Sequence, residues 1–320
     1  MKVFIDGQEG TTGLQLEERL RRRNDVELLV IDPELRKDVT AKKKLMDKAD
    51  VIFLCLPDDA ARISASMAPP DVLVIDASTA HRTKPNWAYG LPELSPKHRA
   101  AIAEGKRISV PGCHACGFIS MVYPLIECGL LRKDAKINCT SLTGYSGGGR
   151  KMIETYEKNR IQGDKYKAPR PYALQLKHKH LPEMTAISGL ENSPHFYPVV
   201  GDMAQGMIVT IHLWQDQFTK KITPAEVENQ LSNHYSTSRF ITVREMQETS
   251  PLTGQKAEPH GLDLGFLDPT ANNGTNNLDI MVFGHDEQIL IAARLDNLGK
   301  GASGSAVQCM NIACGLNESL

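Results

Sequence analysis

The sequence predicts an α/β protein with a Rossmann-type, doubly wound parallel sheet and a second, α+β domain. Three observations support this fold class. Apolar runs of strand length alternate with helix-like spacing through the first 115 residues, and a glycine-rich turn follows the first run. After Cys113 the pattern changes to longer alternating runs, which predict a mixed or antiparallel sheet with flanking helices.

In the first part of the chain, strands are expected at four apolar runs. The third of these is almost continuously apolar, as in strands that are buried on both faces of a parallel sheet. Helical spacing of leucines or alanines follows the first and third strands. The strands are predicted at residues 2–6, 26–32, 49–57 and 72–78, and the helices at about 12–23 and 58–68.

Beyond Cys113, an apolar helix is predicted at 117–128, followed by a glycine-rich loop at 144–150. Strand-like alternation recurs at 206–215 and 278–296, and the second of these is predicted to be a hairpin that turns at Gly284-His285-Asp286. A final helix, at roughly 302–317, is expected to pack back on the first domain.

Composition excludes several classes of protein. The 320 residues are 41% hydrophobic and 23% charged, with a net charge of −1, so no basic stripe suggests nucleic-acid binding. The start lacks a secretory leader, and no apolar run approaches the roughly 18 to 20 residues that span a bilayer. Most of the seven scattered cysteines lie in apolar surroundings, as expected of small buried hydrophobes in a reducing compartment. We therefore expect a cytoplasmic protein that acts on a small molecule.

A dinucleotide-phosphate turn is predicted near the N-terminus. Three glycines at spacing of three lie between the first strand and the first helix, where backbone N–H groups can approach a pyrophosphate at a helix N-terminus. Two threonines can add hydroxyl donors. The predicted contacts are Gly7, Gly10, Thr11, Thr12 and Gly13.

The choice of nicotinamide cofactor stays open on these residues alone. Asp32 falls where NAD-binding proteins place the acid that holds the ribose 2′-OH. Arg36 and Lys37 follow closely and offer charges for a 2′-phosphate instead. The balance lies only slightly toward NADP.

Cys113 is the candidate nucleophile. It follows Pro-Gly and precedes the apolar helix, where the helix dipole and unpaired N–H groups lower a thiol pKa from about 8.5 and favour the thiolate. Thiolate nucleophiles of acyl-transfer enzymes need such an environment. The alternatives are a redox pair with Cys116, half of a metal site, or a structural thiol. No second cysteine pair at zinc-ligand spacing exists, so no metal is expected, and Cys116 is interpreted as noncatalytic.

An acid/base partner is predicted in the segment HKHLPE. His178 and His180 would share a face of an extended segment, and Glu183 could orient one imidazole. A metal role for the two histidines lacks an evident third ligand. Other isolated histidines are interpreted as surface or packed residues, namely His195, His212, His234 and His260.

Taken together, these segments resemble the short (type 2) N-acetyl-γ-glutamyl-phosphate reductases of arginine biosynthesis, which are similar in fold to aspartate-semialdehyde dehydrogenases. The resemblance runs nearly end to end. The matching segments are FIDGQEGTTGLQL, LRKD, LCLPDDAA, VIDASTAHRT, YGLPEL, PGC, GYSGGGR, HKHLPE, NGTNN and DNLGKGASGSAVQ.

The resemblance implies an NADP-binding domain at 1–113, completed by the C-terminal helix at about 298–320, and a catalytic, substrate and oligomerisation domain at 114–297. Cys113 would attack an acyl phosphate, and NADPH would reduce the thioester to a semialdehyde. His180 would be the acid/base, with His178 as the less favoured candidate.

The resemblance also implies binding residues and favours Arg36 and Lys37, and hence NADP(H), over Asp32. Further cofactor contacts would be Leu56, Pro57, Ser78, Asn297, Gly299 and Gly301. Glycine N–H groups followed by a guanidinium suit a phosphate or carboxylate, which would make Ser146, Gly147, Gly148 and Arg150 substrate-binding. The alternative for this loop is a flexible connection between domains.

The segment around the nucleophile departs from the family. Asn-Pro-Gly-Cys-Tyr-Pro-Thr-Gly is usual there, whereas residues 110–117 read Val-Pro-Gly-Cys-His-Ala-Cys-Gly. Val110 removes an amide beside the nucleophile, and loss of an oxyanion donor costs roughly 10² to 10³ in rate. His114 adds a titratable group beside the thiolate.

Three functions therefore remain in view: the reductase, a paralogous semialdehyde dehydrogenase with another acyl phosphate, and a catalytically weak NADP-binding regulatory protein. Retention of Cys113, His178, His180 and Glu183 argues against the last. Enzymes of this type commonly form homodimers or homotetramers.

Overall fold

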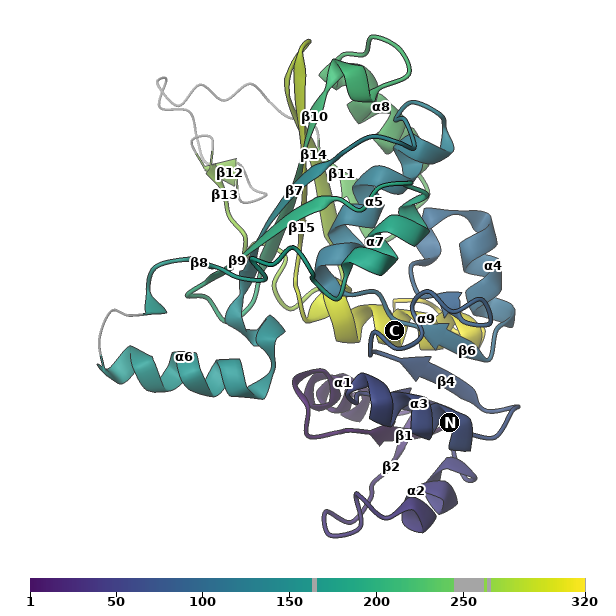
Figure 1. The fold of residues 1–320 in the computed structure, drawn as a ribbon. Helices are drawn as coiled ribbons and strands as arrows, with labels where there is room; N and C mark the ends of the chain where they lie inside the picture. The colour runs from purple at the N-terminus through teal and green to yellow at the C-terminus, as the bar shows by residue number, and fades with distance from the viewer. Residues whose placement is uncertain (163–165, 245–261, 264–265, 320) are drawn as a thin grey trace. The chain divides into compact units, whose positions relative to one another are not determined.

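The computed structural model describes residues 1–162, 166–244, 262–263 and 266–319 (Figure 1). The chain divides into two compact units. The first unit contains residues 1–112 and 302–320, and the second contains residues 113–301. Each is described by itself.

A parallel sheet forms the centre of the first unit, as the alternating pattern predicts. Its strand order is β2-β1-β3-β4-β6-β5, and every neighbouring pair among the described strands is parallel. The central strands are buried on both faces because their residues are almost all apolar. The strands are β1 (Lys2–Asp6), β2 (Glu27–Leu29), β3 (Val51–Leu54), β4 (Leu73–Asp76), β5 (Ala88–Tyr89) and β6 (Arg107–Ser109).

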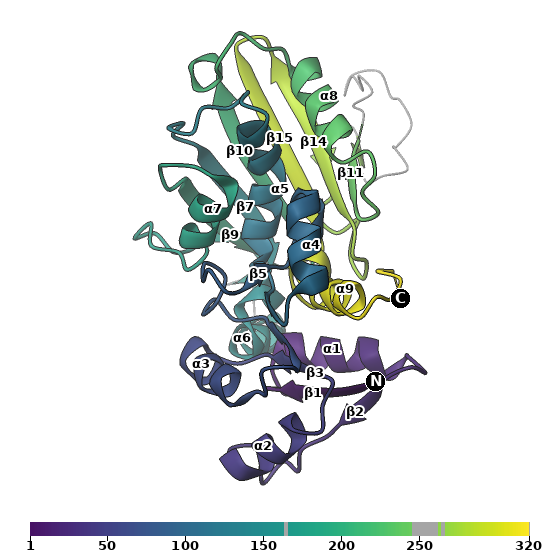
Figure 2. The ribbon, with the colours of Figure 1, turned by 90° about the vertical axis from the view of Figure 1, so that its right-hand side faces the viewer.

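Helices cover both faces of this sheet. They are α1 (Thr11–Arg21), α2 (Val39–Met46), α3 (Asp58–Met67), α4 (Pro96–Glu104) and α9 (Gly304–Ala313), with a short 3₁₀ turn η1 (Pro92–Leu94) before α4. Side chains alternate along a strand, so Val3 faces Leu16 of α1 and Met310 of α9, whereas Phe4 faces Met46 of α2. Figure 2 shows α1 and α2 on opposite sides of β1.

The second unit is built on a mixed sheet with the order β11-β14-β15-β10-β7-β9-β8. The pairs β7/β9 and β11/β14 are parallel, and the other described pairs are antiparallel. The strands are β7 (Asn138–Gly144), β8 (Arg170–Pro171), β9 (His195–Gly201), β10 (Met207–Trp214), β11 (Ile241–Val243), β14 (Leu278–His285) and β15 (Gln288–Leu295). A separate two-stranded sheet joins β12 (Leu262–Asp263) to β13 (Phe266–Leu267).

Helices α5, α7 and α8 lie along one face of the mixed sheet (Figure 2). Gly117 lets α5 approach β10, because a Cβ there would lie 2.8 Å from the Val209 side chain. Thr223 and Glu226 form a capping box that starts α8. The bounds are α5 (Cys113–Glu127), α6 (Arg150–Gln162), α7 (Leu181–Ser188), α8 (Pro224–His234), η2 (Tyr145–Gly148), η4 (Gln215–Gln217) and the π-helical η5 (Gly299–Ser303).

The predicted hairpin at 278–296 is confirmed as β14 and β15, but the position predicted for its turn is wrong. His285 pairs with Gln288, so the turn consists of Asp286 and Glu287. Gly284 stays within β14 with φ of 116°, and a Cβ there would lie 2.2 Å from the Gln288 carbonyl oxygen.

Three further boundaries differ from the prediction. The second strand is limited to β2, and α5 begins at Cys113 rather than at residue 117. The C-terminal segment forms a π turn before α9, and α9 ends at Ala313, shortly before Gly315 with φ of 68°.

Within the described parts of the chain, no helix combines the length and apolarity needed to cross a bilayer.

Candidate active site

Cys113 is the first residue of α5 and is half-buried. This position places its thiol at the positive end of the helix dipole, which stabilises an anion. The backbone of Gly301 lies against it, because a Cβ on Gly301 would be 2.7 Å from the Cys113 Cβ. By contrast, burial raises the pKa of Cys55 and Cys139 above the ordinary range, which makes both thiols poor nucleophiles.

Three imidazoles gather beside Cys113. The ring centroid of His114 lies 5.4 Å from those of both His178 and His180, and the latter two are 4.7 Å apart. The Cys113 Sγ and one nitrogen from each of His114 and His180 lie within 4.8 Å of one another. The residues that the sequence singled out on separate segments therefore meet at one place in the second unit.

The expectation of an extended segment at His178 and His180 is wrong. The chain turns there, because α7 begins at Leu181, whose N–H donates to the His178 carbonyl at 3.1 Å. The backbone N–H of His180 also donates to His178 Nδ1 at 3.2 Å. This bond engages the Nδ1 lone pair of His178, which leaves His180 as the stronger candidate for proton transfer. His180 is 4% exposed.

Glu183 lies in the first turn of α7 and is 2% exposed. It belongs to the same short helix that His180 precedes. Its assignment as the group that orients an imidazole stays a prediction.

His114 has a different role from the one expected. Its Nδ1 lies 2.8 Å from Ser141 Oγ, and its Nε2 lies 2.8 Å from the Tyr172 hydroxyl. Burial, followed by the nearby charges of His178 and Lys179, lowers the pKa of His114 to about 3. It is therefore neutral at physiological pH, so it adds two hydrogen bonds beside the nucleophile and no charge.

Tyr172 is a site residue that the sequence analysis missed. Burial raises its pKa, and the negative charge of Cys113 raises it further. Tyr172 therefore keeps its proton beside the nucleophile and presents a neutral hydroxyl. Its only sequence signal is its position six residues before His178.

A metal ion bound at this cluster would have to compete with the hydrogen bonds of His114. Cys113, His114 and His180 supply three ligand types that suit a transition metal. Both ring nitrogens of His114 already take part in hydrogen bonds, to Ser141 and Tyr172. Coordination by His114 would break one of them.

The glycine-rich loop is η2 and the start of α6, and Asn297 holds it in place. The Asn297 side chain accepts from the Gly206 N–H at 2.9 Å and donates to Ser146 Oγ at 2.9 Å. Gly147 approaches the same amide closely, since a Cβ there would lie 3.5 Å from its nitrogen. These contacts join the loop to Asn297 and, through it, to the Gly206 backbone.

Arg150, predicted to bind substrate, and Gly299, predicted to bind cofactor, both belong to the second unit. Arg150 is exposed and pairs with Glu154 along α6. Gly299 permits close packing, because a Cβ there would lie 2.1 Å from the Thr275 carbonyl oxygen. The assignment of Asn297, Gly299 and Gly301 to the nicotinamide stays a prediction.

In the first unit, the glycine turn fits a dinucleotide phosphate. Gly7 has φ of 90°, and a Cβ there would lie 2.3 Å from the Cys55 carbonyl oxygen. A Cβ on Gly13 would lie 2.5 Å from the Gly7 oxygen, so the turn needs glycine at both positions. Thr11 Oγ1 is buried without a hydrogen-bond partner among the described residues, and Gly10 caps α1 without a side-chain bond. These groups are suited to an anion.

Asp32, Arg36 and Lys37, which are predicted to select between NAD and NADP, follow the second strand, β2. Asp32 accepts from the Glu34 N–H at 2.9 Å, so its carboxylate already stabilises the local turn. Arg36 pairs with Glu9, which lies inside the glycine turn, and Lys37 is exposed. The guanidinium therefore lies next to the phosphate-binding turn.

Ser78 follows β4 and is fixed by Asp76. Asp76 accepts from the Ser78 N–H at 2.9 Å and from its hydroxyl at 2.7 Å, and it also lies 2.6 Å from His81 Nδ1. Sequence analysis missed this Asp76–His81 pair. Leu56 and Pro57 follow β3, and Pro57 precedes the first residue of α3.

The histidines outside the cluster agree in part with the sequence interpretation. His195 and His212 are exposed, and His234 is half-buried. His260 lies outside the described residues.

Comparisons with known proteins identify the class of this fold and site. Residues 2–102 match the family described as semialdehyde dehydrogenase, NAD binding domain, and residues 113–297 match its dimerisation domain. A probable aspartate-semialdehyde dehydrogenase from Pseudomonas aeruginosa shares the fold, with a TM-score of 0.71, 15% identity and 98% of each chain covered. A Candida albicans aspartate semialdehyde dehydrogenase solved with NADP has a TM-score of 0.65 and 15% identity over 97% of each chain. The class is that of the semialdehyde dehydrogenases.

Closer relatives are curated as N-acetyl-gamma-glutamyl-phosphate reductases. One from Nostoc sp. is 43% identical over 325 residues, covering 100% of this chain and 98% of the relative. Another from Chelativorans sp. is 43% identical over 97% of each chain. The chain belongs to the N-acetyl-gamma-glutamyl-phosphate reductase family, and the predicted resemblance is confirmed.

Proposed function

We propose that this protein reduces N-acetyl-L-glutamyl 5-phosphate to N-acetyl-L-glutamate 5-semialdehyde and phosphate, with NADPH, in arginine biosynthesis. The observation that carries the proposal is the meeting of Cys113, at the N-terminus of α5, with a nitrogen of His180 less than 4.8 Å away. A nucleophile and a base this close, beside a helix N-terminus, need only a small adjustment to share the hydrogen bond that acyl transfer through a thiolate uses.

Cys113 begins the reaction. Its thiolate attacks the γ-carbonyl carbon of the acyl phosphate, an S–C bond forms, and the C–O bond to phosphate breaks, which leaves a thioester. NADPH, when bound, supplies the hydride that converts the thioester to the aldehyde and returns the thiolate.

His180 is the proposed acid/base. It accepts the Cys113 thiol proton before attack and returns a proton to an oxygen of the reacting group. Its support is its burial and its approach to Cys113, together with the backbone hydrogen bond that engages His178 Nδ1. Because the pKa of His114 is lowered to about 3, His114 does not compete for this proton near neutral pH.

The substrate phosphate is assigned to the loop at 146–150. Backbone N–H groups of Gly147 and Gly148, the Ser146 hydroxyl and the Arg150 guanidinium are the donors and the charge that suit a phosphoryl group. The bond from Asn297 to Ser146 supports this assignment, because it holds the loop ready before substrate arrives.

NADP(H) is the proposed cofactor. Gly7 and Gly13 let the turn close tightly on backbone atoms, Gly10 lies between them, and Thr11 and Thr12 supply hydroxyls. Arg36 is the proposed partner of the 2′-phosphate, with Lys37 beside it. The pairing of Arg36 with Glu9 supports this, since it keeps the guanidinium near the turn.

The protein is also proposed to form a homodimer or homotetramer through its second unit. The match of residues 113–297 to a family described as a dimerisation domain supports self-association. Light scattering after size-exclusion chromatography measures this directly.

One assay tests the proposed activity: phosphate-dependent reduction of NADP⁺ with N-acetylglutamate semialdehyde, run in parallel with aspartate semialdehyde. Turnover of the first aldehyde, lost in Cys113→Ser, is the expected result. Preference for another aldehyde would instead support a paralogous dehydrogenase. Cofactor binding without turnover would support a regulatory protein.

A further inference from the structure

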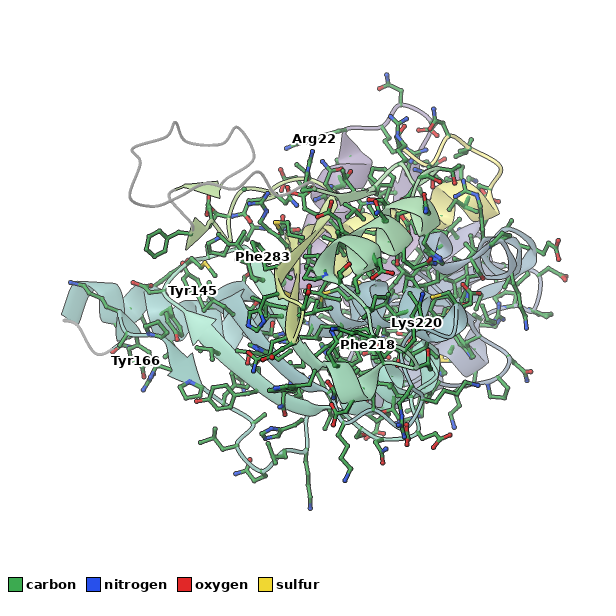
Figure 3. All side chains as sticks on the ribbon, turned by 90° about the horizontal axis from the view of Figure 1, so that it is seen from above. Arg22, Tyr145, Tyr166, Phe218, Lys220 and Phe283 are labelled. Carbon is green, nitrogen blue, oxygen red and sulfur yellow. The ribbon has the colours of Figure 1, made fainter. Side chains whose placement is uncertain are left out.

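The second unit contains a pocket of about 480 Å³ between α6, β8 and β9. This volume is within the range of small-molecule sites. Its lining includes Gly148 of the substrate loop, three tyrosines and two basic side chains, namely Tyr156, Tyr166, Tyr172, Lys151 and Arg170. Figure 3 shows Tyr145 and Tyr166 at the same end of the molecule, and Tyr156 contacts both rings.

The charge of the pocket favours an anion. Its charged lining residues are Lys151 and Arg170, and both are cationic. The guanidinium carbon of Arg170 lies 4.3 Å from the centroid of the Tyr166 ring, so the aromatic face supports it. The forked N–H groups of a guanidinium suit a carboxylate in a bidentate geometry.

A buried hydroxyl in the pocket lies beside Arg170. Tyr156 is 2% exposed, and its hydroxyl interacts with the Arg170 side chain. Burial raises the pKa of Tyr156, and the nearby charge of Arg170 opposes that rise. The hydroxyl thus lies near the guanidinium, so two polar groups meet in the same part of the pocket.

The pocket adjoins the nucleophile through Tyr172. Tyr172 lines the pocket, and its hydroxyl lies 2.8 Å from Nε2 of His114, the residue after Cys113. The pocket also has an apolar side, because Met152 and Val200 pack with Tyr156 in one cluster. A substrate that reacts at Cys113 therefore has a cationic and partly apolar recess beside it.

We infer that this pocket binds the N-acylated amino-acid end of the substrate, and that Arg170 binds its α-carboxylate. The inference rests on the proposed function. The other basic residues near the site fit less well. Arg150 is engaged with Glu154 on the exposed side of α6, and Lys177 and Lys179 are exposed. Lys151 adds a second positive charge, and the acetyl methyl group packs against Met152 and Val200.

The test compares two aldehydes that differ only in the carboxylate. These are N-acetylglutamate semialdehyde and 4-acetamidobutanal, which has hydrogen in place of the α-carboxylate. Wild type, Arg170→Gln and Arg170→Lys are assayed for phosphate-dependent NADP⁺ reduction. Arg132→Gln is the matched control, because Arg132 is an exposed arginine paired with Asp134.

Arg170→Gln is expected to lower kcat/KM for the carboxylated aldehyde roughly 10- to 100-fold, mainly through KM, because a hydrogen bond to a charged group is lost. Its kcat/KM for 4-acetamidobutanal stays within about 2-fold of wild type, since no carboxylate is present to bind. Activity on this second aldehyde also reports that the variant is folded. Arg170→Lys keeps the charge and gives an intermediate loss.

Equal losses on both aldehydes, or no loss on either while wild type is active, would overturn the inference alone. A wild type that turns over neither aldehyde would overturn the proposed function and this inference with it. The two failures are therefore distinguishable.

Discussion

The Nε2 atom of His114 lies 2.8 Å from the hydroxyl oxygen of Tyr172, which joins α5 to the residue after β8. His114 is the second residue of α5, directly after Cys113. Its second ring nitrogen contacts Ser141, so the imidazole is held from both sides. A polar network thus surrounds the nucleophile, and it leads to predictions about stability and rate.

Acid should destabilise the protein through His114. The pKa of His114 is about 3 in the folded state and about 6.5 in the unfolded chain, so the unfolded state binds the proton between these values. The contribution of neutral His114 to the free energy of unfolding is therefore fully present above pH 6.5 and is lost as pH falls toward 3. The loss from His114 alone is about 2 kcal/mol between pH 6.5 and pH 5.

Urea denaturation at about pH 7.5 and about pH 5 measures this effect. His114→Gln should flatten the pH dependence of the free energy of unfolding, whereas His212→Gln, at an exposed position of β10, should leave it as in wild type. An unchanged pH dependence in His114→Gln would contradict the buried neutral imidazole.

Tyr172→Phe should slow the reaction. It removes a neutral hydroxyl beside Cys113, and loss of one hydrogen bond of this kind costs about 1 kcal/mol, or roughly 5-fold in kcat. His114→Gln and Tyr172→Phe should be non-additive by about 0.5 kcal/mol or more, because the two residues share a hydrogen bond. Steady-state kinetics of both single variants and the double variant give this coupling; strict additivity would argue against a functional pair.

His180→Asn should impair turnover more than His178→Asn. Loss of the acid/base lowers kcat by roughly 10² to 10⁴, whereas His178 has its Nδ1 engaged by the His180 backbone N–H. The pH profile of kcat/KM separates the two variants. Only His180→Asn should remove the fall in kcat/KM at acidic pH that reports protonation of the base. If the His178 variant loses that fall instead, the assignment is reversed.

Arg36→Ala should raise KM for NADPH and leave that for NADH nearly unchanged. A lost charged hydrogen bond to the 2′-phosphate corresponds to roughly 10- to 100-fold in KM. Arg22→Ala is the control, because Arg22 directly follows α1 and its side chain is 76% exposed (Figure 3). Equal changes for both cofactors would contradict a role in 2′-phosphate recognition.

Much of the first unit was predictable, because local patterns determine it. Val51–Leu54 and Leu73–Asp76 are short apolar runs that can be buried only on both faces of a parallel sheet. The glycine turn was equally local. Helix α8 had a readable start in Thr223-Pro224 and Glu226, a signal that the sequence analysis did not use.

The hydrogen-bond network beside Cys113 could not be predicted from local sequence patterns. The contact of His114 with Tyr172 joins residues 58 apart, and it depends on β8 pairing with the edge of the mixed sheet. The sequence led us to expect His114 as a titratable group beside the thiolate. Its burial by α5, β7 and β9 neighbours, including Phe196, reverses that expectation. Sequence spacing predicted the nucleophile, whereas tertiary packing sets its surroundings.

The most direct test is to identify the residue that carries the acyl group. Enzyme is mixed with N-acetylglutamate semialdehyde and NADP⁺ without phosphate, quenched in acid and digested for peptide mass spectrometry. The account predicts an N-acetylglutamyl group on Cys113 that disappears when phosphate is added and is absent in Cys113→Ser. NADPH formation with the acyl group on Cys116, or on no residue at all, would contradict it.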